Sequence, residues 1–332
     1  MNSLAKEFRG KEILVTGGAG CIGSNLVSTL LEGNPKRIVV LDDLSASREW
    51  NIPRDPKVLF LRGSVLDDKH LEKGFSGSPQ VVFHLAAHFA NQNSIDHPET
   101  DLEVNGQGTL KMLHYSRKSK VSKFVYAGSG CSVYGSKAPL PLTEEFVSLH
   151  LDTPYQITKL LGELYCNFYN DYYKLPIVIC RFFNVYGPGE IPGKYRNVIP
   201  NFIFWALQKR ALPITGTGDE TRDWTYVSDI IDGMLRCATT PSADGEAINL
   251  ASGTETKVSD VAEIVNGLTG NASGITRLPR RDWDKITRRR ASIEKASKLT
   301  GYRPKVKIQD GIGDTIKWIT AHRTLIDREV GF

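Results

Sequence analysis

Short apolar runs recur at regular intervals through the first half of this 332-residue chain. Each run is apolar at consecutive positions and is bounded by turn-forming residues, which is typical of strands covered on both faces of a sheet. Helical stretches at 23–31, 104–119 and 155–174 separate several of the runs. Strands that alternate with helices predict right-handed crossovers and a doubly wound parallel sheet. The predicted strands are 11–17, 37–43, 57–63, 80–86, 122–129 and 176–183.

The pattern changes after about residue 185. Glycine and proline become frequent, helices dominate, and the remaining apolar runs are short and scattered. We therefore expect an α/β sheet domain over residues 1–185 and a smaller, mixed α/β lobe over residues 186–332, with some chain exchanged between them.

Composition removes several classes of protein. With 40% hydrophobic and 24% charged residues the chain is neither disordered nor fibrous. It contains no run of 18 apolar residues, and its first residues are charged, so we expect neither a membrane span nor export. Five scattered cysteines without a C-x-x-C pair favour reduced thiols and a cytoplasmic location. A net charge of 42 − 37 = +5 fits a small anionic ligand better than a nucleic acid.

A glycine motif follows the first predicted strand and precedes the first predicted helix. Gly17 allows a tight turn, Gly20 lets the backbone approach a diphosphate, and Gly23 permits close packing of helix on strand. The helix that begins near Cys21 and Ile22 directs its N-terminal N–H groups at the phosphates. In this context the motif predicts a Rossmann-type dinucleotide site rather than a plain turn.

Asp42 ends the second predicted strand, 19 residues after Gly23. A carboxylate there accepts hydrogen bonds from the adenine-ribose 2′-hydroxyl and repels a 2′-phosphate, so NAD is expected rather than NADP. The adjacent Asp43 belongs to the same expected site. Further cofactor contacts are expected from residues that follow the third and fourth strands. Asn105 is assigned to the same site, where it could cap or cross-link neighbouring strands; the alternative is an ordinary asparagine at the start of a helix. These residues are Ser64, Val65, Leu85, Ala86, Ala87 and Asn105.

Tyr155 and Lys159 are four residues apart within a helical stretch, so both side chains face one ligand. A phenol has a pKa near 10, too high for a general base at neutral pH. We expect the adjacent ammonium, together with an oxidised nicotinamide, to lower that pKa, and Lys159 to bind the nicotinamide ribose as well.

With these residues in place, the chain resembles an extended short-chain dehydrogenase/reductase of the nucleotide-sugar epimerase/dehydratase group. The resemblance runs from Glu12 to about Trp318 and rests on TGGAGCIGS, VFHLAA, SVYG, YQITK, RFFNVYGPG, NVIPNF, TRDWTYVSDI and the segment from Arg290 to Pro304. It implies Tyr155 as general acid/base and Lys159 as its helper.

One position departs from the family pattern. The usual catalytic Ser or Thr, four residues before Tyr134, is Gly130 here. We expect Ser129 to supply the missing hydroxyl, with Ser132 the second choice and the Cys131 thiol a minor alternative. The other cysteines, Cys21 included, are expected to be small core residues, and His84 and His88 are not expected to bind metal.

The resemblance also implies a nucleoside-diphosphate sugar as substrate. Asn184 and Asn197 would hold its sugar and diphosphate, and Arg222 and Arg281 would neutralise its phosphates. The run 288–290 is expected to be a solvated basic face. Similar enzymes pair two subunits through the helices predicted at 104–119 and 155–174, so a homodimer is expected.

Those parts allow oxidation of a sugar carbon by NAD. A dehydratase of this group would carry an Asp-Glu pair where this chain has Cys131 and Ser132, and a decarboxylase tends to carry a Glu at the position of Ser132. The resemblance therefore leaves 4-epimerisation through a transient 4-keto sugar as the expected reaction. Three alternatives remain: a dehydratase or decarboxylase of the same group, a dehydrogenase that releases its reduced cofactor, and, more distantly, a non-catalytic NAD-binding sensor. The nucleobase, the sugar and the group at carbon 6 are left open.

Overall fold

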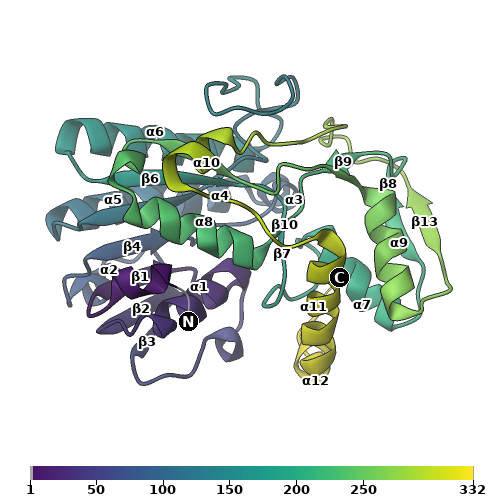
Figure 1. The fold of residues 1–332 in the computed structure, drawn as a ribbon, viewed down its shortest axis with the longest axis horizontal. Coiled ribbons are helices and arrows are strands. Elements are labelled where there is room, and N and C mark those ends of the chain that lie inside the picture. The colour runs from purple at the N-terminus through teal and green to yellow at the C-terminus, as the bar shows by residue number, and fades with distance from the viewer. Residues whose placement is uncertain (1–2, 332) are drawn as a thin grey trace.

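A seven-stranded parallel sheet forms the centre of the molecule, which a computed structural model describes over residues 3–331 (Figure 1). The strand order is β11-β6-β5-β4-β1-β2-β3, and every neighbouring pair is parallel. The order reverses between β1 and β4, as in doubly wound sheets. The predicted sheet is therefore confirmed, with one additional strand. In chain order the strands are β1 (Glu12–Thr16), β2 (Arg37–Asp42), β3 (Val58–Arg62), β4 (Val81–His84), β5 (Lys123–Ser129), β6 (Ile177–Phe182) and β11 (Ala247–Leu250).

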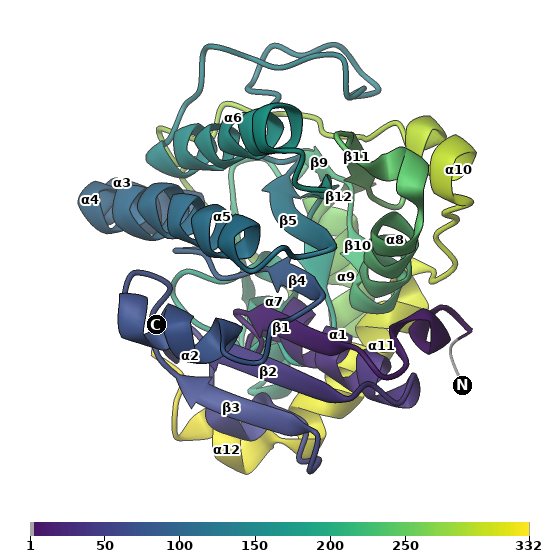
Figure 2. The same cartoon turned by 90° about the vertical axis from the view of Figure 1, so that its left-hand side faces the viewer.

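Helices cover both faces of this sheet, and Figure 2 shows the two layers with the strands between them. One buried core joins the sheet to α1 and α8, and a second joins it to α2, α5 and α6. The first layer contains α1 (Cys21–Glu32), α8 (Val227–Thr239) and the 3₁₀ turn Leu4–Phe8; the second contains α2 (Asp68–Phe75), α5 (Thr109–Lys118) and α6 (Pro154–Tyr173).

Two local expectations need correction. The stretch predicted as one helix at 104–119 begins as a π-helix, Leu102–Gly108, and only then continues as α5. The strand β3 is not covered on both faces, since Leu59 is 41% exposed. Its apolar run resembles that of a central strand, but β3 lies at the edge of the sheet, where fewer side chains pack against it.

The C-terminal half of the chain builds a smaller lobe and also returns to the sheet. A separate apolar core that includes Phe202, Val261 and Ile312 lies between α7, α9 and α11. Because β11 pairs with β6, residues beyond 185 contribute to both parts, and the boundary at 185 stays a prediction. The remaining elements are α3 (Asn91–Asp96), α4 (Pro98–Asp101), α7 (Val198–Leu207), α9 (Val258–Thr269), α10 (Glu294–Thr300), α11 (Ile308–Ala321), α12 (Arg323–Asp327), β7 (Val185–Tyr186), β8 (Leu212–Thr215), β9 (Thr221–Arg222), β10 (Thr225–Tyr226), β12 (Thr256–Lys257), β13 (Ile275–Leu278) and the 3₁₀ turns Glu49–Asn51 and Pro241–Ala243.

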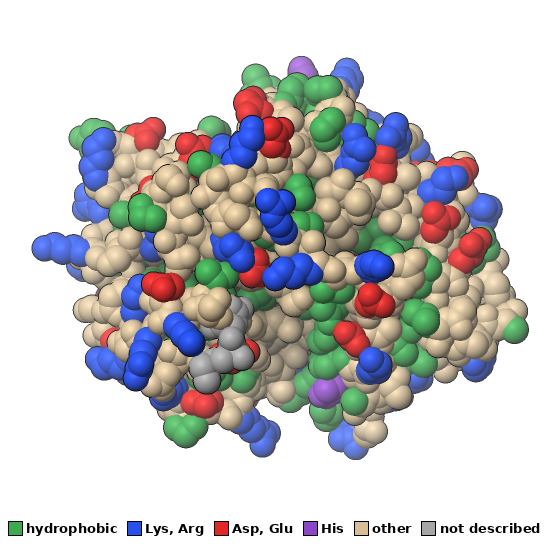
Figure 3. All heavy atoms as spheres, in the orientation of Figure 1, with side chains coloured by type: hydrophobic (Ala, Val, Ile, Leu, Met, Phe, Trp, Pro, Cys, Tyr) green, Lys and Arg blue, Asp and Glu red, His purple; other side chains and the backbone are tan. Residues whose placement is uncertain are grey.

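The surface mixes charges of both signs. Figure 3 shows lysine and arginine interspersed with aspartate and glutamate over one face, with apolar side chains exposed between them. Among the helices of residues 3–331, none has the length and hydropathy needed to cross a bilayer.

A buried ion pair connects α6 to the sheet, next to the loop that follows β5 and contains Tyr134. Arg181 of β6 donates to both carboxylate oxygens of Glu163, at 2.8–3.2 Å, and its Nη1 donates to the Tyr134 hydroxyl at 3.0 Å. Both charged side chains are less than 5% exposed. Such a pair is costly to break because the remaining charge stays buried without its partner.

We predict that Glu163→Ala destabilises the protein by about 3–5 kcal/mol, since it leaves the buried Arg181 guanidinium without its ionic partner. Chemical denaturation monitored by circular dichroism measures this loss. The matched control is Glu294→Ala, which breaks the exposed i,i+4 pair with Lys298 and is expected to leave the midpoint unchanged. Equal midpoints for the two variants would contradict the prediction.

Candidate active site

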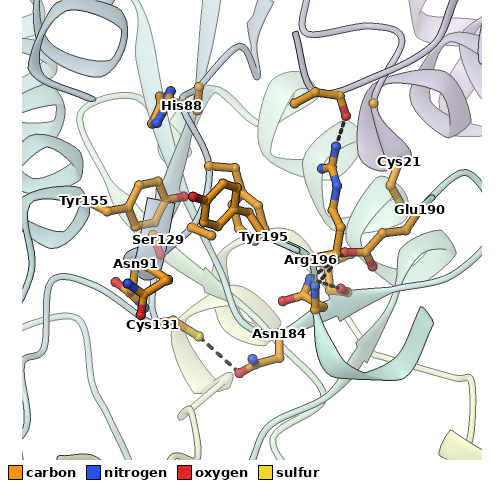
Figure 4. Close-up of a pocket in the computed structure, with 18 of the residues that line it drawn as sticks. Cys21, His88, Asn91, Ser129, Cys131, Tyr155, Asn184, Glu190, Tyr195 and Arg196 are labelled. Atoms are coloured by element: carbon orange, nitrogen blue, oxygen red, sulfur yellow. Dashed lines mark hydrogen bonds between the residues drawn. The ribbon is translucent and has the colours of Figure 1, made fainter. Parts of the chain in front are cut away.

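A cavity of about 760 Å³ opens at the carboxyl ends of the strands, between the sheet and the smaller lobe. In open parallel sheets this edge is where ligands bind. Figure 4 shows two groups of side chains facing one another across it: Tyr155, Ser129 and Cys131 on one side, and Glu190 and Arg196 on the other.

The glycine loop after β1 is sterically obligatory. A Cβ on Gly17, whose φ is +70°, would lie 2.7 Å from the Ala86 nitrogen, and one on Gly23 would lie 2.2 Å from the Gly17 carbonyl oxygen. Only glycine permits this close packing. Gly20 is the N-cap of α1, and within residues 3–331 no side chain caps this helix or places an acid in its first turn. The N-terminal N–H groups are thus available to an anion at the cavity wall.

Cys21 packs against the core only in part, and it also lies at the cavity, where the cofactor site was expected. It is half-buried at the start of α1, lines the cavity, and its Sγ lies 3.4 Å from the Pro188 carbonyl oxygen. The smaller lobe packs against the glycine loop at this point, which keeps Cys21 at the cavity rather than within the sheet. By contrast, Cys166, Cys180 and Cys237 are fully buried, as expected.

Asp42 ends β2 beside this loop. Its Oδ2 accepts a hydrogen bond from the Ala19 N–H at 3.0 Å, and its Oδ1 accepts from the Leu44 N–H and the Ser47 hydroxyl at 2.9 and 2.8 Å. These donors fix the carboxylate at the cavity edge, where a ribose hydroxyl can reach it. The residues fit a dinucleotide: an uncapped helix N-terminus, a glycine loop and a fixed acid share one cavity. Its wall also includes Gly17, Gly20, Ile22, Gly23, Asp43, Ser64, Val65, Leu85, Ala86 and Ala87.

Asn105 is absent from the part of the cavity wall formed by residues 3–331. It is buried in the π-helix, where its side chain accepts from the His88 N–H at 2.8 Å and donates to Asp101 Oδ1 at 2.8 Å. Asn105 therefore links the π-helix to the loop after β4, which does line the cavity, rather than to a neighbouring strand.

Tyr155 and Lys159 come from the first turns of α6. Thr153 caps this helix by accepting from the Gln156 N–H at 3.4 Å, and Pro154 occupies its first position. The i,i+4 spacing brings the Lys159 Nζ to 5.9 Å from the centre of the Tyr155 ring. The same Nζ donates to the Ala127 carbonyl oxygen at 3.0 Å, which anchors it to the end of β5.

Burial governs the protonation of this pair. It raises the pKa of the Tyr155 phenol, and it lowers the pKa of Lys159 to about 8. The chain alone therefore does not give the low phenol pKa that is expected with an oxidised nicotinamide bound, because burial favours the neutral form of both groups. The nearby Asp101 carboxylate adds to the increase for Tyr155.

Two serine hydroxyls lie next to this pair. Ser129, the last residue of β5, is within hydrogen-bonding reach of Tyr155, and Ser132 donates to the Ser129 oxygen at 2.8 Å. A Cβ on Gly130 would lie 2.0 Å from the buried Phe183 ring. A serine at position 130 would therefore require the Phe183 ring to move, and the choice of Ser129 as the catalytic hydroxyl stays a prediction.

The substrate side of the cavity contains all four predicted residues: Asn184, Asn197, Arg222 and Arg281. Arg222 pairs with Asp284 at 3.2 Å, and the Asn184 Oδ1 accepts from the Cys131 thiol at 3.2 Å. The Nδ2 of Asn197 donates to the Val185 carbonyl and to Glu190. This leaves the Asn197 oxygen as its polar atom for a ligand.

Arg289 corrects the expectation of a solvated basic run. It is 2% exposed, and it donates to the Gly130 and Gly135 carbonyl oxygens at 3.0 and 3.4 Å. Its guanidinium thus holds both ends of the loop that carries Cys131 and Ser132. Its neighbour Arg288 is exposed and pairs with Glu255, as a solvated residue would. The sequence could not have predicted which of the three consecutive arginines is buried, because they are identical in chemistry.

Sequence reasoning also missed Glu190 and Arg196, which line the cavity opposite Tyr155 (Figure 4). Their position in the sequence could have indicated the cavity, because both lie in the glycine- and proline-rich segment between two predicted substrate residues, Asn184 and Asn197.

We predict that Gly130→Ser lowers stability by about 1–3 kcal/mol and also lowers activity, because the new Cβ must displace the Phe183 ring. Thermal unfolding and a turnover assay measure the two effects. The control is Gly267→Ala in α9, where a Cβ meets nothing within 4 Å and the substitution is expected to be neutral or stabilising. A gain of activity in Gly130→Ser would contradict the steric argument.

Comparisons with known proteins agree with this geometry. Residues 13–251 match the model of the NAD dependent epimerase/dehydratase family. The UDP-glucose 4-epimerase of Mycolicibacterium smegmatis is 33% identical over 92% of this chain and 97% of its own length. The solved structure of the epimerase Mth375 from Methanothermobacter thermautotrophicus is 52% identical, with a TM-score of 0.98 over 99% and 98% of the two chains. The Bordetella bronchiseptica enzyme WbmF, solved with NAD+ and UDP, is 37% identical, with a TM-score of 0.86 over 97% and 96%. The chain belongs to the NAD-dependent epimerase/dehydratase family.

Proposed function

We propose that this protein epimerises a nucleoside-diphosphate sugar at carbon 4, using NAD as a cofactor that is regenerated in each turnover. The observation that supports this most is one cavity that holds a dinucleotide loop, the Tyr155–Lys159 pair and the arginine Arg222. The sugar would thereby lie between the cofactor and Tyr155, with its diphosphate toward Arg222.

When bound, the nicotinamide supplies the chemistry of accepting a hydride from the sugar carbon and returning it. Tyr155 takes the proton of the hydroxyl on that carbon, and Ser129 hydrogen-bonds the same oxygen. Lys159 supplies a positive charge that favours the phenolate. After the keto sugar rotates to present its opposite face for the return of the hydride, Tyr155 returns the proton to the oxygen. Because the hydride and the proton return to the carbon and the oxygen that they left, the net reaction is isomerisation.

The loop after β5 separates this reaction from its alternatives. Cys131 and Ser132 occupy the positions where a carboxylate pair would assist loss of water, and Ser132 the position where a glutamate would be expected in a decarboxylase. Burial raises the pKa of the Cys131 thiol, which keeps it protonated. Uridine is the nucleobase we propose, because relatives act on or were solved with uridine nucleotides, as their names state. The dehydrogenase remains the second candidate.

A product screen tests the proposal directly. The purified protein is incubated with UDP-, GDP-, CDP- and dTDP-sugars, and the products are identified by NMR. We expect conversion of a UDP-sugar into its 4-epimer without added NAD, with no net reduced cofactor. Stoichiometric formation of NADH with an oxidised sugar would instead establish the dehydrogenase.

We predict that Tyr155→Phe lowers turnover by about 10²–10⁴-fold while bound NAD is retained, because only proton transfer is lost. Ser129→Ala is expected to cost less, since it removes one hydrogen bond. Lys159→Ala should reduce both turnover and NAD retention. Turnover is measured on the sugar found in the screen, and NAD content by absorbance after denaturation. Near-wild-type turnover of Tyr155→Phe would rule out the proposed base.

We further propose a homodimer, formed through α6 and its neighbours. One face of α6 exposes Ile157, Leu164, Phe168 and Tyr172, each 49–69% exposed. Leu161, Leu164, Tyr165 and Phe168 also line a hollow of about 320 Å³ on this face. Exposed large apolar side chains at helical spacing support burial against a second copy of the chain. A cytoplasmic location is part of the same proposal and rests on the scattered cysteines.

We predict that the double variant Leu164→Glu/Phe168→Glu is a monomer, because two carboxylates would have to be buried in the interface. Light scattering at micromolar concentration measures the mass. The control is Leu149→Glu, which changes a leucine that is 89% exposed on a loop and is expected to leave the dimer intact. A monomeric wild-type protein would contradict the dimer.

A further inference from the structure

The smaller lobe packs directly onto the dinucleotide loop. Asn25 of α1 donates to the Pro188 carbonyl at 2.8 Å, and Asn51 bridges the Ala19 and Gly189 carbonyls at 2.9 and 3.0 Å. A Cβ on Gly189 would lie 3.3 Å from the Cys21 Cα. The segment 187–197, which we call the clasp segment, therefore lies against the N-terminus of α1.

Arg196 projects from the clasp segment across the cavity (Figure 4). Its guanidinium donates to the carbonyl oxygen of Ala46, in the loop that follows Asp42. The nearby charge of Glu190 favours the protonated form of this guanidinium. A guanidinium has five N–H donors, so a single carbonyl leaves most of them available.

Glu190 is the second incomplete group on the same wall. Its Oε1 accepts from Asn197, but its Oε2 is buried, and among residues 3–331 it has no hydrogen-bond partner. Burial raises the pKa of this carboxyl to about 7. A buried polar atom without a partner is costly, which indicates that a ligand with hydroxyl donors completes the site.

We propose that Arg196 binds the diphosphate of the dinucleotide from the side opposite the glycine loop, and that Glu190 accepts a hydrogen bond from an adjacent ribose hydroxyl. The anion then lies between the α1 N-terminus and a guanidinium, both of which favour negative charge. Cofactor release requires the clasp segment to leave the glycine loop. The two lobes thus hold the cofactor together, which suits an enzyme that reuses it.

This inference deepens the proposed function at the cofactor site, so its test measures binding rather than turnover. The probes are ADP-ribose, which has the diphosphate and both riboses, and adenosine, which lacks the phosphates. Their affinities for the full chain, freed of copurified cofactor, are measured by calorimetry and NMR titration.

Arg196→Gln is expected to weaken ADP-ribose binding by at least about tenfold and to leave adenosine binding unchanged. The control is Arg210→Gln, an exposed arginine of the same lobe outside the cavity, with no expected effect on either probe. If Arg196→Gln does not fold, Arg196→Lys is used instead. It keeps the charge but not the paired N–H donors of the guanidinium, so a smaller loss of affinity, for ADP-ribose alone, is expected. ADP-ribose binding within twofold of wild type in a folded variant, or an equal loss for both probes, would overturn the proposal. Either outcome leaves the epimerase reaction untouched.

Discussion

Tyr155 and Lys159 are both buried, and burial opposes the charge that each would carry in the proposed reaction. The phenol has a raised pKa, and the ammonium has a pKa of about 8, since desolvation acts on both. The rest of the site offsets this constraint. The Ala127 carbonyl accepts a hydrogen bond from the ammonium, the adjacent Ser129 hydroxyl favours the ionised phenol, and an oxidised nicotinamide beside them would add positive charge when bound. Without a bound cofactor, burial therefore favours the neutral phenol of Tyr155.

Parallel strands bring these groups together because their carboxyl ends share one edge of the sheet. The glycine loop follows β1, Asp42 ends β2, and Ser129 ends β5. The smaller lobe then closes the cavity from the other side. Arg289 fixes the loop after β5 through two carbonyls, and the clasp segment packs on the glycine loop. The candidate active site therefore lies between two parts of one chain. The sheet domain supplies the glycine loop and the loop after β5, and the smaller lobe supplies the residues that pack against both loops.

The sequence predicted the features that depend on neighbours along the chain. The glycine loop, Asp42 and the Tyr155–Lys159 pair follow from spacing within one strand or helix, and all of them line the cavity. The features that it missed depend on tertiary burial. Arg289 lies in a basic run but packs beneath the catalytic loop, Asn105 supports a loop instead of a ligand, and Gly130 is explained by the distant Phe183 ring. The edge position of β3 depends on strand order, which an apolar run does not encode.

In the proposed epimerisation, hydride leaves and returns to the same carbon of one sugar. A substrate labelled with deuterium at carbon 4, incubated with the enzyme in ordinary water, tests this transfer. We expect NMR to find the deuterium at carbon 4 of the epimer, undiluted by solvent hydrogen. Loss of the label to water would contradict it, because that result requires removal of a proton, rather than a hydride, from the carbon.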